Sequence, residues 1–313
     1  MRLLADMAPR ILVTGGSGQL SVALEAASAA RNMPLRRVGR PALDFDRLDS
    51  IAAVLADTAP WLVVNAAAYT AVDAAEDDAE AARRANCDGP AELARLCEVA
   101  RIPLIHVSTD YVFDGRMGAP YVETDPTAPQ GVYGATKLAG EQAVLAACTR
   151  AIVLRTSWVY SPTGKNFVRT MLNLAQRTDR LRVVGDQRGC PTSAPDLAET
   201  ILTIADRIAA DGWQDRYAGI YHAAGTGWTT WHGLAVAIFS EAARHGAAVP
   251  RVDAITTADY PTKAKRPADS RLDCGKLQAV FGVSLPPWQD GLARSIDAIC
   301  AVPSVEPMPH TAG

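Results

Sequence analysis

The sequence has few of the features that mark disulfide-rich, metal-binding or membrane proteins. Its six cysteines are scattered without a C-x-x-C pair, which argues against a disulfide framework or a zinc site and favours a reducing compartment. No uninterrupted apolar run approaches the length of a membrane span, and the apolar stretch before Asp6 is too short for a signal peptide. The formal net charge of -3 provides no overall field that would attract nucleic acid or anionic lipid. We therefore expect a cytoplasmic protein with neither a nucleic-acid nor a membrane partner.

The first half of the chain alternates between strand-like and helix-like segments. Short β-branched runs, such as residues 10–14, meet glycine or small residues abruptly, as buried parallel strands do. This alternation predicts an α/β fold with a doubly wound, Rossmann-like parallel sheet whose ligands sit at the carboxyl ends of the strands. The predicted strands are 10–14, 35–38, 61–65, 104–108, 151–155 and 219–223, and the predicted helices are 19–31, 51–57, 71–85, 89–100 and 133–147.

The alternation loosens after Trp158, and the sequence after about residue 250 is rich in proline, so we expect it to be loop-rich. We predict a dinucleotide-binding domain over 8–160, with a later contribution from about 190–224. A smaller substrate lobe should comprise the rest of the ordered chain, in two segments, 161–189 and 225–300. Residues 301–313 contain three prolines and few apolar residues, which predicts a disordered tail.

A glycine-rich turn joins the first predicted strand to the first predicted helix. Its pattern is Gly15-x-x-Gly18-x-x-Ser21, with serine at the third glycine position. Such a turn lets the backbone approach a pyrophosphate, whose charge then lies on free N–H groups at the helix N-terminus. A plain strand-to-helix turn would also account for the glycines, but the strand–turn–helix context favours dinucleotide binding.

The segment after the second predicted strand indicates which dinucleotide is bound. An acid there would bind the ribose 2′-hydroxyl of NAD, whereas arginine accommodates the 2′-phosphate of NADP. The chain has Arg36-Arg37-Val38-Gly39-Arg40 and no acid before Asp44. This favours NADPH, with Arg40 at the phosphate and NADH still possible; the alternative is that these arginines form a solvated edge.

The segment Asn65-Ala66-Ala67-Ala68-Tyr69-Thr70 follows the third predicted strand. Its small side chains leave room for a ribose. Thr70 and Asp73 have the spacing of a capping box, and we interpret Asp73 and Glu76 as first-turn acids that favour the helix dipole.

Tyr133, Lys137 and Thr109 form a candidate proton-transfer set. Positions four apart share one face of a helix, so Lys137 can lie beside Tyr133. A nearby ammonium is expected to lower the pKa of the phenol toward the working pH, and Thr109, at the end of a predicted strand, can hold the reacting oxygen. An aromatic anchor next to a solvated lysine would have the same spacing, but the upstream phosphate loop favours hydride chemistry on a carbonyl or carbinol.

These motifs together resemble the extended short-chain dehydrogenase/reductase family, and within it the dTDP-4-dehydrorhamnose reductases. The likeness runs from about residue 10 to 298. The segments that carry it are VTGGSGQL at 13–20, NAAAYTAVD at 65–73, STDYVFDG at 108–115, YGATKLAGE at 133–141, RTSWVY at 155–160, NFV at 166–168, DQRGCPT at 186–192, and RP followed by SRL within 266–272.

The resemblance implies a role for each matching residue. Tyr133, Lys137 and Thr109 would be the catalytic residues, with Tyr133 and Lys137 also touching the cofactor. The further cofactor contacts would be Gly18, Gln19, Leu20, Asp44, Phe45, Ala67, Ala68 and Thr70. The substrate would be held by Thr109, Asp110 and Trp158, although Trp158 also suits core packing. Gly39 stands where many relatives have an acid, which supports NADPH. Ala23 stands where some have a glutamate that helps bind magnesium at a dimer interface, so we expect no metal.

The implied reaction is NADPH-dependent reduction of the C4 ketone of dTDP-4-dehydro-L-rhamnose to dTDP-L-rhamnose, in a possible homodimer. Two alternatives remain. One is a nucleotide-sugar epimerase, dehydratase or other reductase of the same fold. The other is a non-catalytic regulatory subunit that resembles the one of methionine adenosyltransferase, although the intact trio argues against it.

Overall fold

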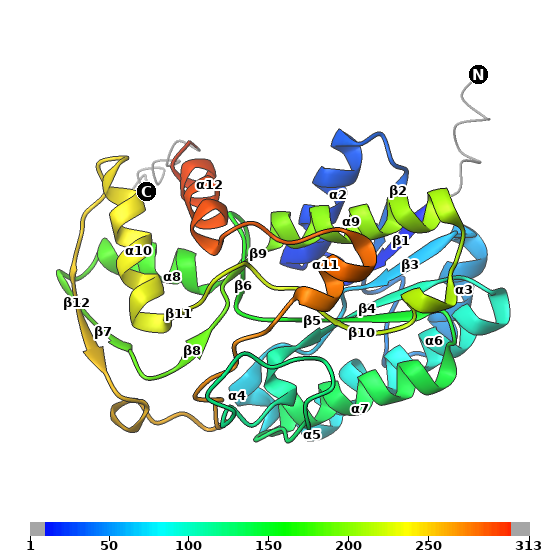
Figure 1. The fold of residues 1–313 in the computed structure, drawn as a ribbon, viewed down its shortest axis with the longest axis horizontal. Coiled ribbons are helices and arrows are strands. Elements are labelled where there is room, and N and C mark those ends of the chain that lie inside the picture. The colour runs from blue at the N-terminus through cyan, green and yellow to red at the C-terminus, as the bar shows by residue number, and fades with distance from the viewer. Residues whose placement is uncertain (1–9, 302–313) are drawn as a thin grey trace, which may run out of the picture.

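The computed structural model describes residues 10–301. A parallel sheet flanked by helices forms one end of the molecule, and a smaller group of helices and short strands forms the other (Figure 1). The predicted disordered tail lies outside the described residues except for Ala301. That residue ends helix α12 (Trp288–Ala301), so the prediction was wrong there.

The central sheet has six parallel strands in the order β10-β5-β4-β3-β1-β2. They are β1 (Ile11–Thr14), β2 (Leu35–Val38), β3 (Leu62–Asn65), β4 (Leu104–Thr109), β5 (Ala151–Thr156) and β10 (Gly219–His222). The chain runs outward from β1 to β2 and then returns to β3 on the other side of β1. The doubly wound prediction is therefore confirmed, and the switch point where such sheets bind ligands lies between β1 and β3.

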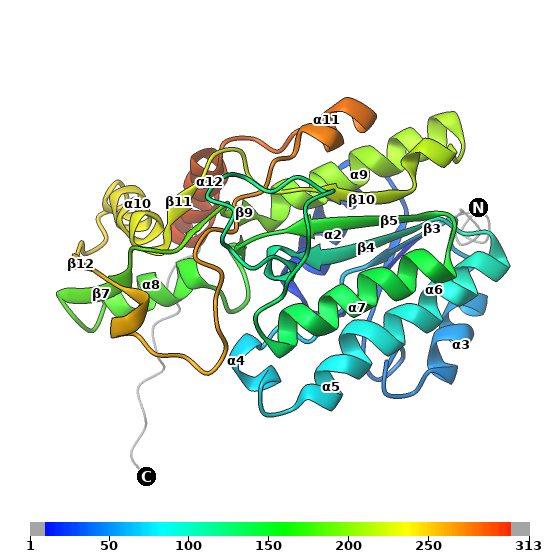
Figure 2. The same ribbon diagram turned by 60° about the horizontal axis from the view of Figure 1, so that its bottom comes forward.

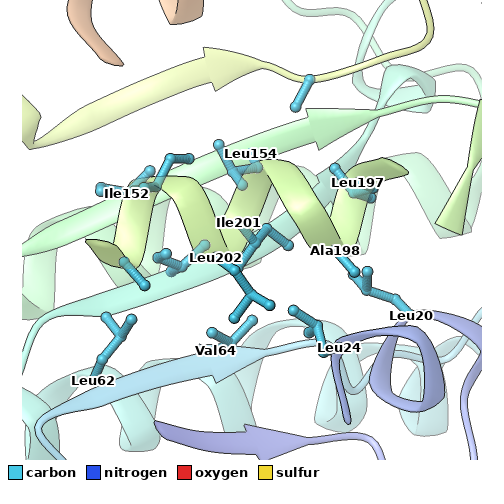
Figure 3. Packing of buried hydrophobic residues seen from close by; sticks show 14 of the residues in the cluster. Leu20, Leu24, Leu62, Val64, Ile152, Leu154, Leu197, Ala198, Ile201 and Leu202 are labelled. Atoms are coloured by element: carbon cyan, nitrogen blue, oxygen red, sulfur yellow. The ribbon is translucent and has the colours of Figure 1, made fainter. Parts of the chain in front are cut away.

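Helices cover both faces of the sheet, which explains why the inner strands are continuously apolar. Ile11 and Val13 pack on one face with helices α2 (Gln19–Ala30) and α9 (Ala194–Asp211), and Leu12 packs on the other. Figure 3 shows the first of these layers, in which Leu197 and Ile201 of α9 lie over the sheet. The opposite face is covered by α3 (Asp49–Thr58), α6 (Gly89–Ala100) and α7 (Val132–Ala147) (Figure 2).

The predicted helix over 71–85 is wrong as a single element. It is divided into α4 (Val72–Ala75) and α5 (Ala79–Arg83), which continues through a π-helical turn, η1 (Arg84–Asp88), into α6. The break occurs at Asp78, whose backbone φ of -135° is not helical and whose side chain accepts the N–H of Ala81. An aspartate that caps the second helix thus ends the first.

A further apolar cluster lies in the C-terminal half, and part of it comes from residues after 250, where loop was expected. Strand β12 (Arg251–Ile255) pairs in parallel with β7 (Arg180–Val184), and helix α12 packs on α10 (Trp231–Ala243). Other elements there are α8 (Phe167–Ala175), α11 (Gly275–Phe281), the 3-10 turns η3 (Asp215–Tyr217) and η4 (Thr257–Asp259), and the two-residue strands β6 (Val159–Tyr160), β8 (Arg188–Gly189), β9 (Thr192–Ser193) and β11 (Thr229–Thr230).

We propose that the division into two lobes follows these clusters. Helices α8, α10 and α12 share one core and would form the substrate lobe. Helix α11 instead contributes Leu277 and Phe281 to the core of the sheet, so residues 275–285 belong with the dinucleotide-binding domain in this proposal, contrary to the sequence-based boundaries. Within residues 10–301 no helix is both long and apolar enough to cross a membrane.

A buried ion pair fixes helix α7 on the sheet. Arg155 of β5 donates through Nη2 to Oε2 of Glu141 at 2.7 Å, and their side chains are only 2% and 1% exposed. The hydroxyl of Ser108, on β4, donates to Oε1 of the same carboxylate at 2.5 Å. One carboxylate therefore ties α7 to two strands, and loss of either charge would leave the other buried and unpaired.

We predict that Glu141→Gln lowers the free energy of unfolding by about 3–5 kcal/mol, because it leaves the Arg155 guanidinium without its counter-charge. Urea denaturation measures the change. The matched control is Glu92→Gln, which breaks the largely exposed pair with Arg95 and should cost at most about 1 kcal/mol. Equal effects of the two substitutions would contradict the structural role of the buried pair.

Candidate active site

A cavity of about 950 Å³ opens at the carboxyl ends of the sheet strands. Its walls come from the glycine turn, the loop after β3, the ends of β4 and β5, the start of α7, the segment just before α8 and the first residue of α10. Of the residues predicted for the site, all of which lie in the described chain, Asp44 alone does not line the cavity. The others that line it are Gly15, Gly18, Gln19, Leu20, Arg40, Phe45, Ala67, Ala68, Thr70, Thr109, Asp110, Tyr133, Lys137 and Trp158.

The glycine turn forms a cradle that side chains would fill. Gly15 has φ of +102°, and a Cβ there would lie 2.9 Å from the carbonyl carbon of Ala66. A Cβ on Gly39 would lie 2.6 Å from the Cα of Gly16. The position after β2 is therefore closed to an acidic side chain because two backbone segments meet there. The geometry fits a pyrophosphate on the turn, and the hydroxyl of Ser21 donates to the carbonyl of Thr14 at 3.0 Å.

Two arginines of the β2 segment have different positions. Arg37 braces the turn by donating to the carbonyl of Gly16 at 2.6 Å. Arg40 lies at the rim, with its side chain 64% exposed and paired with Asp44 and Asp46. Asp44 thus holds Arg40 and does not face the cavity, in contrast to its expected direct contact with the cofactor.

The loop after β3 is fixed by buried hydrogen bonds. The Thr14 hydroxyl donates to Oδ1 of Asn65 at 2.6 Å, and Asn86 accepts the N–H of Tyr69 at 2.8 Å while donating to the hydroxyl of Thr136 at 3.1 Å. Asn86 lies in the π-helical turn η1, a type of turn that often occurs at functional sites. It joins the loop to α7.

The predicted capping box of Thr70 and Asp73 is wrong. Helix α4 begins after Ala71 without a side-chain cap, and Asp73 forms an ion pair with Arg266 at 2.7 Å. Glu76 accepts the N–H of Val132 at 2.8 Å. This acid therefore lies at the N-terminus of α7, where its negative charge interacts favourably with the positive end of the helix dipole.

The three predicted catalytic residues meet on one wall of the cavity. Thr109 ends β4, and its hydroxyl donates to Oδ1 of Asp110 at 3.1 Å. Lys137 is buried on α7 and donates through Nζ to the carbonyl of Val107 at 2.7 Å. Tyr133 lies one turn earlier on the same helix, half-buried, with its ring at the cavity.

Burial dominates the titration of these groups. It raises the pKa of the Tyr133 phenol to about 12, with Thr109 opposing the rise and Asp110 adding to it. The net lowering of this pKa that was expected is therefore wrong, because burial dominates. Burial lowers the pKa of Lys137 to about 8, against the effect of Glu141, and raises the pKa of Asp110 to about 6. At neutral pH the phenol keeps its proton, whereas Lys137 is mostly an ammonium.

Two buried oxygen atoms on the cavity wall have unused hydrogen-bonding capacity. Oδ2 of Asp110 and Oγ1 of Thr156 make no well-formed hydrogen bond within residues 10–301. Buried polar atoms are normally paired, so these two atoms are unusual features of the wall beside Thr109.

A pair of indole rings forms another part of the cavity wall. Trp158 was predicted from the sequence, whereas its partner, Trp231, was missed. Trp158 stacks on Trp231 with ring centroids 3.6 Å apart and planes 8° from parallel. Trp158 has φ of +47°, a strained value for a bulky residue that commonly accompanies function. Trp231 begins α10 far along the chain, and no local pattern places it beside Trp158. The pair offers a flat apolar surface for a sugar or base.

The start of α8 contacts the start of α2 across the cavity. Asn166 donates through Nδ2 to Oε1 of Gln19 at 2.9 Å. This bond links the phosphate cradle to the C-terminal lobe. Within residues 10–301 no group of three or more histidine, cysteine, aspartate or glutamate side chains could hold a metal ion.

Comparison with known proteins gives consistent results. The family model described as "RmlD substrate binding domain" matches residues 9–300. A dTDP-4-dehydrorhamnose reductase of Sinorhizobium fredii is 44% identical over 290 residues, which cover 93% of this chain and 97% of the relative. A probable dTDP-4,6-dihydroxy-2-methyloxan-3-one 4-ketoreductase of Streptomyces antibioticus is 42% identical over 93% of this chain and 96% of the relative.

Among solved structures, dTDP-4-dehydrorhamnose reductase from Bacillus anthracis in complex with NADP has a TM-score of 0.85 and 31% identity. The match covers 93% of this chain and 99% of that one.

We predict that Lys137 titrates near pH 8, well below the ordinary lysine value of 10.5, because its ammonium is buried. NMR of ¹³C-labelled lysine should show one side-chain signal with this midpoint, and Lys137→Arg should remove that signal. In the matched control, Lys165→Arg, which replaces an exposed lysine of the cavity rim, the signal should remain. A Lys137 signal with a midpoint above pH 10 would contradict the burial argument.

Proposed function

The chain belongs to the RmlD substrate-binding-domain family, and on that basis we propose that it reduces the C4 ketone of dTDP-4-dehydro-L-rhamnose to dTDP-L-rhamnose with NADPH. The observation that carries the proposal is the convergence of Thr109, Tyr133 and Lys137 beside the glycine cradle in one cavity. It is an NADPH-dependent oxidoreductase of the extended short-chain type.

The residues of the cradle suit the cofactor. Gly15, Gly16 and Gly39 leave the backbone open to a pyrophosphate, and Arg40 at the rim would meet a 2′-phosphate. Bound NADPH would supply the hydride to the sugar carbon. The chain itself has to orient the ketone, exclude water and deliver a proton.

We assign the proton delivery to Tyr133. Hydride addition turns the ketone oxygen into an alkoxide, which takes the phenolic proton and becomes the product hydroxyl. Since burial keeps the pKa of Tyr133 near 12, the phenol is protonated at the start of each turnover. The ammonium of Lys137, one helical turn away, would stabilise the phenolate that forms and contact the cofactor ribose.

We assign sugar binding to Thr109, Asp110 and Trp158. The Thr109 hydroxyl would hold the reacting oxygen, the Asp110 carboxylate would accept a sugar hydroxyl, and the indole pair of Trp158 and Trp231 would carry an apolar face. A homodimer and a cytoplasmic location remain part of this proposal.

A panel of 4-keto nucleotide sugars, followed by NADPH absorbance, tests the substrate. We expect fastest turnover with dTDP-4-dehydro-L-rhamnose. Turnover confined to another 4-keto deoxysugar, such as the substrate named for the Streptomyces relative, would narrow the activity to a different 4-ketoreductase. Tight retention of NAD through purification without net NADPH oxidation would instead indicate an epimerase. Co-purification of a second chain without turnover would indicate a regulatory subunit.

The control for this assay is Tyr133→Phe, which removes the proton but keeps the ring. Loss of a positioned general acid should lower kcat on the order of 100- to 10,000-fold, with NADPH still bound as judged by fluorescence titration. Wild-type turnover in this variant would contradict the assignment of Tyr133.

We predict that Arg40→Ala weakens NADPH without weakening NADH. A charge-assisted contact to a phosphate is worth about tenfold to a hundredfold in affinity, so the ratio of the two KM values should change by about that factor. Arg36→Ala is the matched control, because Arg36 pairs with Asp57 and does not line the cavity. If the two variants had the same ratio, Arg40 would not read the 2′-phosphate.

A further inference from the structure

Tyr111 contacts each part of the proton-transfer set, although neither its place in the sequence nor the proposed reaction assigns it a task. It follows Thr109 by two positions in the 3-10 turn η2 (Asp110–Val112). Its N–H donates to the hydroxyl of Thr109 at 3.2 Å. This bond limits the directions in which the Thr109 hydroxyl can point.

The carbonyl of Tyr111 lies against the start of helix α7. A Cβ on Gly134 would be only 2.2 Å from that oxygen, so the glycine after Tyr133 allows a direct backbone approach. The helix that carries Tyr133 is therefore seated on the backbone of Tyr111.

The ring of Tyr111 also meets the ring of Tyr133. Their centroids are 5.5 Å apart and their planes are inclined by 76°, an edge-to-face contact. Such a pair contributes about 0.5–1.5 kcal/mol beyond its buried area. Both residues line the cavity, so the contact restrains the catalytic phenol.

The Tyr111 side chain also meets a group from the C-terminal half of the chain. The Arg266 guanidinium interacts electrostatically with the phenol of Tyr111, and it forms a two-pronged pair with Asp73, at 2.7 Å and 3.3 Å. The N–H of Ala264 donates to the same carboxylate at 3.1 Å. Nearby, Lys263 pairs with Asp77. The segment 263–266 is thus fastened to α4 and to the turn that follows it, and it carries the guanidinium that interacts with Tyr111.

We propose that Tyr111 is a positioning residue for proton transfer: its ring fixes the Tyr133 phenol, and Arg266 fixes Tyr111 in turn. This inference rests on the proposed reductase function. It makes the C-terminal segment 263–266 part of the catalytic geometry, although it contributes no reacting group. Burial raises the pKa of Tyr111, so it stays neutral and is not a second proton donor at working pH.

The first test compares three variants by steady-state kinetics. Tyr111→Leu removes the ring contact and should lower kcat roughly 10- to 100-fold, since a misplaced catalytic group loses about that factor. Tyr111→Phe keeps the ring and should recover most of this loss. The matched control is Tyr121→Phe, whose ring stacks on Phe113 away from Tyr133 and whose kcat should stay within about twofold of wild type.

The second test asks whether Tyr111 acts through Tyr133. In a Tyr133→Phe background, Tyr111→Leu should cause no further loss of kcat, because coupled residues are not additive. The solvent deuterium isotope effect on kcat should rise in Tyr111→Leu with Tyr133 present, since proton transfer becomes slower. Neither a lowered folded fraction nor a weaker cofactor site predicts this pattern. Thermal unfolding should show that Tyr111→Leu remains folded at the assay temperature, and the Kd of NADPH, measured without turnover, should stay near wild type.

The inference is overturned if Tyr111→Leu keeps wild-type kcat, or if it lowers kcat equally with and without the Tyr133 hydroxyl. In both cases the proposed function would still hold, provided that the wild-type protein reduces the sugar. If the wild-type protein reduces no 4-keto nucleotide sugar, the proposed function fails first and this inference fails with it.

Discussion

The buried pair of Glu141 and Arg155 is the interaction on which the active-site geometry depends. Tyr133 and Lys137 can act together only if α7 lies at one height and one rotation over the ends of β4 and β5. Glu141 lies one turn beyond Lys137 and binds Arg155 and Ser108. These contacts fix both the height and the rotation of α7. Close backbone contacts reinforce the setting: a Cβ on Gly140 would be 1.9 Å from the carbonyl of Asn86. A buried pair of this kind is a weak source of net stability, but it permits one arrangement and penalises the others. We therefore infer that the pair specifies the position of α7 on the sheet.

The exclusion of water that makes the pair of Glu141 and Arg155 selective also determines the protonation of Tyr133 and Lys137. It favours the neutral phenol of Tyr133 and weakens the hold of Lys137 on its proton. The phenol is therefore ready to donate, and the charge that appears on it during reduction would be met by a nearby ammonium in a medium of low dielectric constant. In such a medium a preorganised charge has more effect than in water. The sequence pattern alone suggested a phenol of lowered pKa. In the structure burial dominates and raises the pKa of that phenol instead.

Local patterns predicted the features that depend on neighbours in the chain. The glycine turn, the parallel strands and the pair of Tyr133 and Lys137 each follow from spacing within one segment, and the family resemblance added Asp110 and Trp158. Features that depend on distant partners were missed. Trp231 reaches Trp158 only through the fold, and Asp73 has the spacing of a helix cap but pairs with Arg266. The prolines after residue 250 suggested loop, yet apolar positions such as Leu292 and Ile296 drive α12 onto α10. Tertiary packing thus outweighed the local preference of this segment for loop structure.

The central claim is that one cavity brings a hydride donor, a sugar ketone and the Tyr133 phenol together. Its most direct test is isotope transfer. The protein is incubated with dTDP-4-dehydro-L-rhamnose and NADPH that carries deuterium at the transferred position of the nicotinamide, and the product is examined by NMR. We predict dTDP-L-rhamnose with deuterium bound to C4 of the sugar and nowhere else. Product without deuterium at C4, or unchanged ketone under conditions where the cofactor is bound, would contradict the account.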